Sequence, residues 1–244
     1  MSLRSLLGFR PSPHDHRDWP LERLGVDPRA SIPLEVSYEG LVDEVFEQSG
    51  PSCVGEATAR AWHLRARIQG EPAPCYPDAL AVYALARAAE FIDASRPLED
   101  SGAFPRCALQ AVSECGVVAR GTWQDPTRLR RPDWAALRAS ADRRVVRYAR
   151  LWTAQDARSA LAAGHPVLVG IDCDESFLDY SGGVWAGMTG PAVGGHAVAA
   201  VGYRAGAIRI VNSWSTGWGE AGFGWLADSV INAAELWAVE ACSP

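Results

Sequence analysis

Segments with a helical pattern dominate the first half of this chain of 244 residues, and segments with a strand pattern dominate the second half. Apolar residues at helical spacing predict helices over residues 52–69, 77–91, 107–115 (closed by Gly116 at its C-cap) and, later, 156–163. Short apolar runs predict strands over residues 166–172, 196–203, 207–212, 223–226 and 236–241. Helices first and strands afterwards favour an α+β fold with two lobes over an alternating α/β sheet.

The same patterns divide the chain into four parts. Residues 1–30 carry Pro, Arg, Asp and His without periodicity, and we expect an extended arm wrapped on the surface. Residues 31–116 form a mainly helical lobe, and residues 151–244 form a mainly β lobe. Residues 117–150 are rich in Arg, Asp, Pro and Trp, and are expected to bridge the two lobes.

The composition excludes several classes of function. A net charge of −6 gives no basic footprint for nucleic acid. No segment has about 18 uninterrupted apolar residues, so no membrane span is expected, and the apolar stretch at the N-terminus is too short for a signal peptide. We therefore expect a cytoplasmic, reduced protein. All 23 positively charged side chains are Arg, which excludes chemistry through a lysine amine.

The six cysteines show no C-x-x-C spacing, so neither a metal site nor a cofactor is predicted. The acidic run Asp172–Glu175 is more typical of a strand end than of a metal site. Five of the cysteines are interpreted as packing residues. Four of the five histidines are expected at the surface or in loops: His14, His16, His63 and His165.

Cys53 differs from the other cysteines because it lies where a Gly/Pro turn meets the Ala-rich start of the first predicted helix. A helix N-terminus lowers the pKa of a thiol through its unpaired N–H groups and its dipole, and the thiolate is the nucleophilic form. A lone cysteine there is more often a small buried hydrophobe. Two distant segments favour the catalytic interpretation, since one supplies His196 and the other supplies Asn212.

These residues provide the parts that a cysteine protease needs. Cys53 would attack an amide carbonyl, and His196 would take the thiol proton and return it to the leaving amine. Asn212 would orient the imidazole. The backbone N–H of Cys53 and the side chain of Gln48 would stabilise the oxyanion. Without Asn212 and Trp214, we would interpret His196 as a core histidine.

The chain resembles the papain-like cysteine peptidases, in particular bacterial and phage-type members without a propeptide. The runs that begin at His196 and at Asn212 are similar to the family's His and Asn blocks, and Ser52–Cys53 lies in a recognisable Cys block. The resemblance covers most of residues 32–240. It implies a helical N-terminal lobe, an antiparallel β-barrel-like C-terminal lobe, and an active-site cleft between Cys53 and His196.

The resemblance also implies roles for other residues. Phe104, Pro105 and Ala197 match wall positions of an apolar subsite beside the nucleophile, so we expect apolar substrate side chains there. Gly102 would line the cleft where the substrate backbone comes close. Trp214 and Trp218 are similar to two tryptophans that, in the family, shield the bond between the catalytic His and Asn from water.

The chain departs from the family pattern near the nucleophile. The family's Gln lies six residues before its Cys, whereas here Glu47 stands at that position and Gln48 lies five residues before Cys53. Because a carboxylate would repel an oxyanion, Gln48 is predicted to fill the role through a loop one residue shorter. Ser215 stands where the family has Gly, and Gly50 stands in place of a disulfide Cys.

The predicted function is hydrolysis of peptide bonds in a peptide or protein substrate through an acyl-enzyme. Two alternatives fit the same residues: a catalytically silent domain that binds peptides or proteins within a larger assembly, and another thiol-dependent acyl transferase or amidase. We expect no inhibitory prodomain, because only about 30 residues precede Ser31 in this sequence. An active intracellular enzyme would therefore need restraint by its specificity, an activity threshold or a proteinaceous inhibitor.

Overall fold

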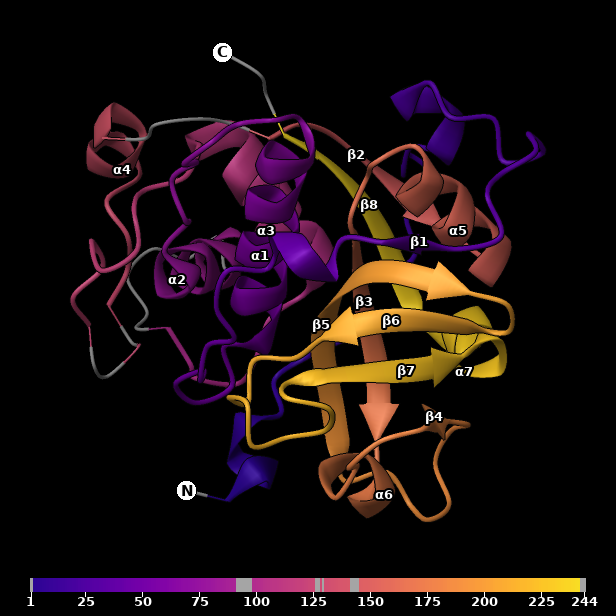
Figure 1. Ribbon diagram of the computed structural model, residues 1–244. Coiled ribbons are helices and arrows are strands. Elements are labelled where there is room, and N and C mark those ends of the chain that lie inside the picture. The colour runs from indigo at the N-terminus through magenta and orange to yellow at the C-terminus, as the bar shows by residue number, and fades with distance from the viewer. Residues whose placement is uncertain (1, 91–97, 126–127, 129, 141–144, 242–244) are drawn as a thin grey trace.

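The computed structural model describes residues 2–90, 98–125, 128, 130–140 and 145–241, with the backbone alone described for residues 140, 145, 146 and 241. Helices from the first half of the chain gather on one side of the molecule, and most strands lie on the other side together with the later helices (Figure 1). The described helices are α1 (Cys53–Ile68), α2 (Ala79–Glu90), α3 (Pro105–Cys115), α4 (Trp134–Ser140), α5 (Ala154–Ala162), α6 (Glu175–Leu178) and α7 (Asp228–Ala233), with short 3-10 turns at Leu3–Leu6, Leu21–Leu24 and Glu39–Leu41. None of these helices combines the length and the hydropathy needed to cross a bilayer.

The strands form one sheet in the described part of the chain. They are β1 (Val36–Ser37), β2 (Val145–Leu151), β3 (Val167–Cys173), β4 (Val184–Trp185), β5 (Gly194–Arg204), β6 (Ala207–Val211), β7 (Phe223–Ala227) and β8 (Glu235–Ala241). Their order is β2-β8-β3-β5-β6-β7-β4, and β1 pairs with β5. All the pairs are antiparallel except β4 with β7. The α+β fold class expected from the sequence is confirmed.

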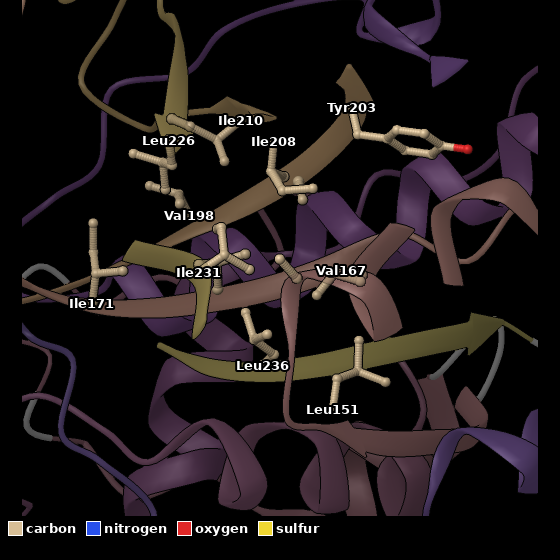
Figure 2. Packing of buried hydrophobic residues seen from close by; sticks show 14 of the residues in the cluster. Leu151, Val167, Ile171, Val198, Tyr203, Ile208, Ile210, Leu226, Ile231 and Leu236 are labelled. Carbon is tan, nitrogen blue, oxygen red and sulfur yellow. The ribbon is translucent and has the colours of Figure 1, made fainter. Parts of the chain in front are cut away.

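Both faces of β3 are buried, which explains its continuous apolar run. Val167 and Ile171 point into the larger core, where α5 and α7 cover the sheet. Figure 2 shows side chains of β3, β5, β6 and β8 on this face together with Ile231 of α7. Leu168 points the other way, into a second core formed with α1, α2 and α3.

Helix α1 connects the helical lobe to the sheet. It packs against α2 on one side and against β5 and β8 on the other, so most of its residues are buried. The small side chains of its Ala-rich sequence permit this double contact. At Gly55 the approach is closest, because a Cβ there would lie 2.3 Å from the carbonyl oxygen of Ala79. This packing fixes the first residue of α1, Cys53, at the boundary between helices and sheet.

Three expectations from the sequence are wrong. The segment 117–150 is not only a bridge, because it contains α4 and the edge strand β2, whose Tyr148 and Leu151 pair with Val239 and Leu236 of β8. The strand was missed because charged residues interrupt its apolar pattern. His63 is buried in α1 against the ring of Tyr76, with 4.8 Å between ring centroids, and is neither a surface nor a loop residue.

The N-terminal arm, residues 1–30, is the third correction, because it is not confined to the surface. Leu6, Leu21 and Leu24 belong to the larger core, and Phe9 belongs to the core beside α1. Short 3-10 turns place these side chains, so no regular period marks them in the sequence. Figure 1 shows the start of the chain, in indigo, close to the boundary between helices and sheet.

Candidate active site

Cys53 begins α1 and is completely buried, with an exposed fraction of 0%. Burial raises the pKa of its thiol to about 12, although backbone N–H groups of Ala197, Gly8 and Val54 and its own N–H point at the sulfur and lower the pKa. A helix N-terminus alone is therefore not enough to ionise this thiol. In this conformation Cys53 is a neutral thiol.

His196 lies on β5, immediately before Ala197, and is also completely buried. Its Nε2 lies 2.7 Å from Oδ1 of Asn212, the residue that follows β6. A carboxamide oxygen only accepts hydrogen bonds, so Nε2 carries the proton and Nδ1 carries the lone pair. Nδ1 is buried and has no hydrogen-bond partner among the residues that the structure describes. Burial lowers the pKa of His196 to about 4, although the bond to Asn212 raises it, so the imidazole is neutral.

Aromatic rings cover the bond between His196 and Asn212. Trp214 stacks on the imidazole, with 4.2 Å between ring centroids and 28° between ring planes. The ring centroid of Trp218 lies 5.9 Å from that of Trp214. Trp218 donates its indole N–H to the carbonyl oxygen of Phe177 at 3.0 Å. Phe177 packs against both tryptophans. It was not predicted as a residue of the site, because no motif in the sequence marks it.

Gln48 is buried, and four hydrogen bonds hold its amide group. Its Oε1 accepts hydrogen bonds from Ser213 Oγ at 2.7 Å and from Trp214 Nε1 at 3.1 Å. These two donors fix the orientation of the amide, because only Oε1 can accept. Its Nε2 therefore points the other way, where it donates to the carbonyl oxygens of Leu6 and Gly50, each at 2.7 Å. Glu47, the alternative, is exposed.

The predicted subsite residues lie around Phe9 of the arm. Ala197 belongs to the same buried cluster as Phe9 and Cys53, and Pro105 is the buried first residue of α3. Gly102 has φ +86, and a Cβ there would lie 2.2 Å from the carbonyl oxygen of Gly8. Phe104 lies under the guanidinium of Arg10, 4.1 Å from its ring centroid. The structure thus places these residues together, against the arm.

The arm was not predicted to enter this site. The backbone N–H of Phe9 donates to Gly195 at 3.0 Å, and Phe9 pairs with Ala103 in a parallel bridge. A Cβ at Gly170 would lie 2.2 Å from the Phe9 ring. The only feature of the sequence that indicated burial of the arm was the apolar run Leu6–Phe9. Such a run does not indicate which residues it will contact.

Within the described residues, no group of three or more His, Cys, Asp or Glu side chains has the arrangement to hold a metal ion. Asp174, in the acidic run, instead caps α6 by accepting from the N–H of Phe177, and it also accepts from the N–H groups of Thr189 and Gly190. The site is built from a thiol, an imidazole and two carboxamides.

Comparison with known proteins agrees with this geometry. The sequence matches the family described as papain family cysteine protease over residues 101–241, which include His196 and Asn212. The chain belongs to the papain family. It is 36% identical to papain of Carica papaya over 129 residues, which are 50% of this chain and 36% of papain. It is 41% identical to a cathepsin B-like cysteine proteinase of Schistosoma japonicum over 61 residues, 23% of this chain and 18% of that protein.

The papain fold extends beyond the matched sequence. Xylellain, a cysteine protease from Xylella fastidiosa, superimposes with a TM-score of 0.77 at 23% identity, over 98% of this chain and 97% of that chain. A Carica candamarcensis cysteine protease solved in complex with E-64 gives a TM-score of 0.64 at 23% identity, over 86% and 99% of the two chains. This chain spans about a third of the length of papain and less than a fifth of the Schistosoma proteinase.

Proposed function

We propose that this papain-family chain is a cysteine peptidase that hydrolyses peptide bonds through an acyl-enzyme. The observation that carries the proposal is the arrangement around His196. Its Nε2 is committed to Asn212, its Nδ1 has no partner, and the N–H of the next residue, Ala197, points at the sulfur of Cys53. A base with one nitrogen fixed and the other free beside a thiol is what thiol activation requires.

Acylation follows from these positions. His196 Nδ1 takes the proton of the Cys53 thiol, and the sulfur forms a bond to the carbonyl carbon of the substrate. The amide of Gln48 and the backbone N–H of Cys53 would donate to the oxyanion. The protonated Nδ1 then gives its proton to the leaving amine as the C–N bond breaks.

Deacylation uses the same residues with water as the nucleophile. His196 Nδ1 takes a proton from water, the oxygen adds to the thioester carbon, and the C–S bond breaks. The product leaves as a carboxylic acid, which releases its proton to solvent, and the proton on His196 returns to the sulfur. Asn212 keeps the imidazole in one orientation through both halves of the cycle, because its Oδ1 accepts from Nε2 while also accepting from the N–H of Ser213 at 2.7 Å.

The test compares Cys53→Ala with Cys107→Ala in hydrolysis of fluorogenic peptides. Cys53→Ala should reduce kcat/KM by about 10⁴-fold or more with little change in the unfolding temperature. Cys107 lies in α3 and is only partly buried, so Cys107→Ala should retain activity. Turnover retained in Cys53→Ala would exclude the proposal.

An electrophilic peptide epoxide, followed by mass spectrometry, separates the alternatives. Stoichiometric labelling of Cys53 with peptide hydrolysis supports a peptidase. Labelling with turnover of simple amides or amine acceptors, but not of peptides, supports an amidase or acyl transferase. Absence of both labelling and turnover, under conditions where the site is accessible, supports a silent binding domain.

For the substrate, we propose an apolar and preferably aromatic side chain in the subsite beside Cys53. The support is that Phe9 already lies in this position, 8% exposed, in a cluster that includes Ala103 and Ala197. Because Gly170 has no side chain, it leaves room for the Phe9 ring, and a Cβ at this position would overlap that ring. A positional peptide library tests this preference, and selection of acidic or basic residues at that subsite would contradict it.

We also propose that the protein works in the cytoplasm. Cys53, Cys107 and Cys173 are free thiols within the described part of the chain, which suits a reducing compartment. Fractionation of cells with an antibody against the chain tests the proposal, and recovery from an oxidising compartment would contradict it.

A further inference from the structure

Glu56 is a buried carboxyl that takes no part in the proposed acylation and deacylation. It lies three residues after Cys53, in the first turn of α1, and it is only 7% exposed. Its Oε2 has no hydrogen-bond partner among the residues that the structure describes. Buried polar atoms are nearly always hydrogen-bonded, so an unpaired carboxyl oxygen indicates a specific role or an ordered water.

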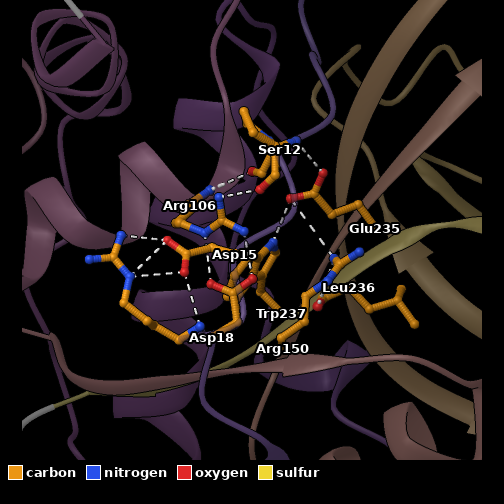
Figure 3. A network of polar contacts seen from close by, with 10 residues as sticks. Ser12, Asp15, Asp18, Arg106, Arg150, Glu235, Leu236 and Trp237 are labelled. Atoms are coloured by element: carbon orange, nitrogen blue, oxygen red, sulfur yellow. Dashed lines mark hydrogen bonds and ion pairs between the residues drawn. The ribbon is translucent and has the colours of Figure 1, made fainter.

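The carboxyl of Glu235, which is buried to the same extent, shows the usual situation (Figure 3). Its two oxygens accept from the N–H of Ser12 and from Nε1 of Trp237, each at 2.7 Å. In the part of the chain that the structure describes, Glu56 is the only residue whose carboxyl has a buried oxygen without a partner. Its environment is therefore different from that of the other buried acids.

Glu56 and Asn212 line the same small cavity, where the first turn of α1 meets the start of β5 and the end of β6. Much of the remaining wall is apolar and buried, and includes Ala197, Val198 and Val211. The cavity volume is about 10 Å³, which is the size of a single water site. A water molecule there has polar groups within reach on more than one side.

The amide of Asn212 offers the donor that matches Glu56. Its Oδ1 accepts from His196 Nε2 and from the N–H of Ser213, both at 2.7 Å. Its Nδ2 carries two N–H groups, is buried, and has no partner among the described residues. An unpaired donor and an unpaired acceptor thus line one cavity. A water between them would accept from Nδ2 and donate to Oε2 of Glu56.

An acceptor on this side of Asn212 favours the orientation of the amide that catalysis needs. A carboxyl oxygen attracts the N–H end of the amide and repels its oxygen. Rotation of the amide by half a turn would direct Oδ1 toward Glu56 and would set an N–H group against the Nε2–H of His196. Glu56, through the amide nitrogen, and Ser213, through the amide oxygen, therefore both keep Oδ1 on the imidazole.

The charge state of Glu56 depends on its surroundings. The titratable and charged side chains around this carboxyl are Glu47, Arg60, Tyr76, Asp78 and Arg120. Burial raises the pKa of Glu56 to about 7, Arg120 and Arg60 lower this pKa, and Asp78 raises it. His196 stays neutral in the same pH range, because burial lowers its pKa to about 4. Glu56 can therefore gain or lose a proton near neutral pH without a change in the charge of His196.

We propose that Glu56 is a positioning residue that binds the N–H groups of Asn212 Nδ2 through one water in the cavity, and so holds the amide oxygen on His196. The inference rests on the proposed function for its kinetic consequences, since the orientation of His196 affects the rate only if His196 is the base. The contact itself is independent of any activity.

The kinetic test compares Glu56→Leu, Glu56→Gln and the control Glu114→Leu in peptide hydrolysis. Glu56→Leu removes the acceptor and should lower kcat about tenfold, with KM within about twofold of wild type, because no contact with the substrate is lost. Glu56→Gln keeps an acceptor oxygen and should lose no more than about threefold. Glu114 is an exposed acidic residue of α3, so Glu114→Leu should match wild type.

A double-mutant cycle shows whether the effect passes through Asn212. In the Asn212→Ala background, Glu56→Leu should change kcat by less than about twofold, because the amide that Glu56 holds is already gone. Equal losses in both backgrounds would overturn the proposal. Thermal unfolding shows which variants are folded. Glu56→Leu should not lower the unfolding temperature at neutral pH, because it removes a buried carboxyl with an unpaired oxygen.

A readout that needs no activity is the nitrogen–proton NMR signal of the Asn212 side-chain amide, assigned by its disappearance in Asn212→Ala. In the wild type this signal should move as the pH is raised from about 5.5 to about 8.5, because Glu56 loses its proton in this range. In Glu56→Gln it should stay fixed. A signal that stays fixed in the wild type, or that moves equally in Glu56→Gln, would overturn the proposal.

The positioning role and the peptidase function fail in different ways. If the Asn212 signal moves as expected but no form of the chain hydrolyses peptides, Glu56 holds the amide and the proposed peptidase function fails. If the wild type hydrolyses peptides and folded Glu56→Leu keeps the wild-type kcat, the peptidase function stands and the positioning role fails. If Glu56→Leu does not fold, Glu56→Met takes its place in the kinetics, and the NMR comparison with Glu56→Gln still decides.

Discussion

His196 and Asn212 are joined by a buried hydrogen bond of 2.7 Å beneath the stacked ring of Trp214. This bond determines which imidazole nitrogen is left for the proposed catalysis, since the proton on Nε2 points at Asn212 Oδ1. An amide in this position orients the ring without adding a charge. The base in this site therefore depends on a residue that would not touch the substrate.

Asn212→Ala should lower kcat by about 10²-fold, because the imidazole loses its fixed tautomer and orientation. Removal of the amide also leaves a buried Nε2–H and a buried Ser213 N–H without their acceptor, which should cost about 1–3 kcal/mol of stability. Stopped-flow kinetics and thermal unfolding measure the two effects. Ser176→Ala is the control, because it removes a side-chain bond to Trp185 Nε1 at 3.0 Å outside the site. Unchanged kcat in Asn212→Ala would show that Asn212 does not position the base.

Gln48→Glu should lower kcat by about 10²- to 10³-fold, because an anionic side chain replaces the amide proposed to stabilise the oxyanion. Glu keeps an acceptor for Ser213 and Trp214 but loses the two bonds that the amide donates to the Leu6 and Gly50 carbonyls, so thermal unfolding must show that the variant is folded. Glu47→Gln is the matched control on the exposed neighbouring residue, and its kinetics should equal those of wild type. If Glu47→Gln changes kcat and Gln48→Glu does not, the assignment belongs to the other residue.

The structure brings together residues that the sequence motifs had singled out, because those motifs specify local structure: His196 bonds to Asn212, and Cys53 lies in one buried cluster with Ala197. The choice between Glu47 and Gln48 also has a physical basis. Glu47 forms a bridge with Trp214, and the N–H of Gln48 donates to the Ser213 carbonyl, so this short stretch is extended. Neighbouring side chains then point to opposite sides, and only one of the two reaches the core. Ser215 adopts the left-handed backbone, with φ +60, that glycine adopts most readily.

The arm could not be predicted in the same way. Gly8 and Phe9 contact residues about 45 to 190 positions away in the chain, including Pro51 and Gly195, and their conformation has no sequence period. Strand β2 was missed for a related reason, since its pairing with β8 depends on a partner about 90 residues later. Local patterns predict elements, whereas these two features depend on distant surfaces that the rest of the fold brings together.

Acidification should destabilise the folded chain through its buried histidines. Burial lowers the pKa of His165 to about 4, below the ordinary value of 6.5, so the unfolded chain holds this proton more tightly. Neutral His165 makes its full contribution to the free energy of unfolding above pH 6.5, and this contribution is lost as the pH falls toward 4. His63 and His196 have pKa values lowered in the same direction.

The combined loss should be on the order of a few kcal/mol between pH 7 and pH 4.5. Thermal unfolding across this range measures it, and His165→Asn should show a shallower decline than wild type. His14→Asn, at an exposed position of the arm, serves as the control and should follow wild type. An unfolding temperature independent of pH between 7 and 4.5 would contradict the prediction.

Gly170→Ala should change both access to Cys53 and substrate choice. Gly170 lies on β3, and its missing side chain leaves room for the Phe9 ring, whose Cε2 would lie 2.2 Å from an added Cβ. The ring must move, so the segment around Phe9 should pack more weakly and Cys53 should be labelled faster by iodoacetamide. The narrower pocket should also lower kcat/KM for aromatic substrates relative to small apolar ones by about tenfold, the scale expected for a lost or clashing methylene-sized contact.

Gly40→Ala is the control, since a Cβ there meets nothing within 4 Å. Peptide pairs that differ only in a Phe or Val at this subsite provide the measurement. Faster labelling with an unchanged preference for Phe would mean that Phe9 occupies a pocket that substrates do not use.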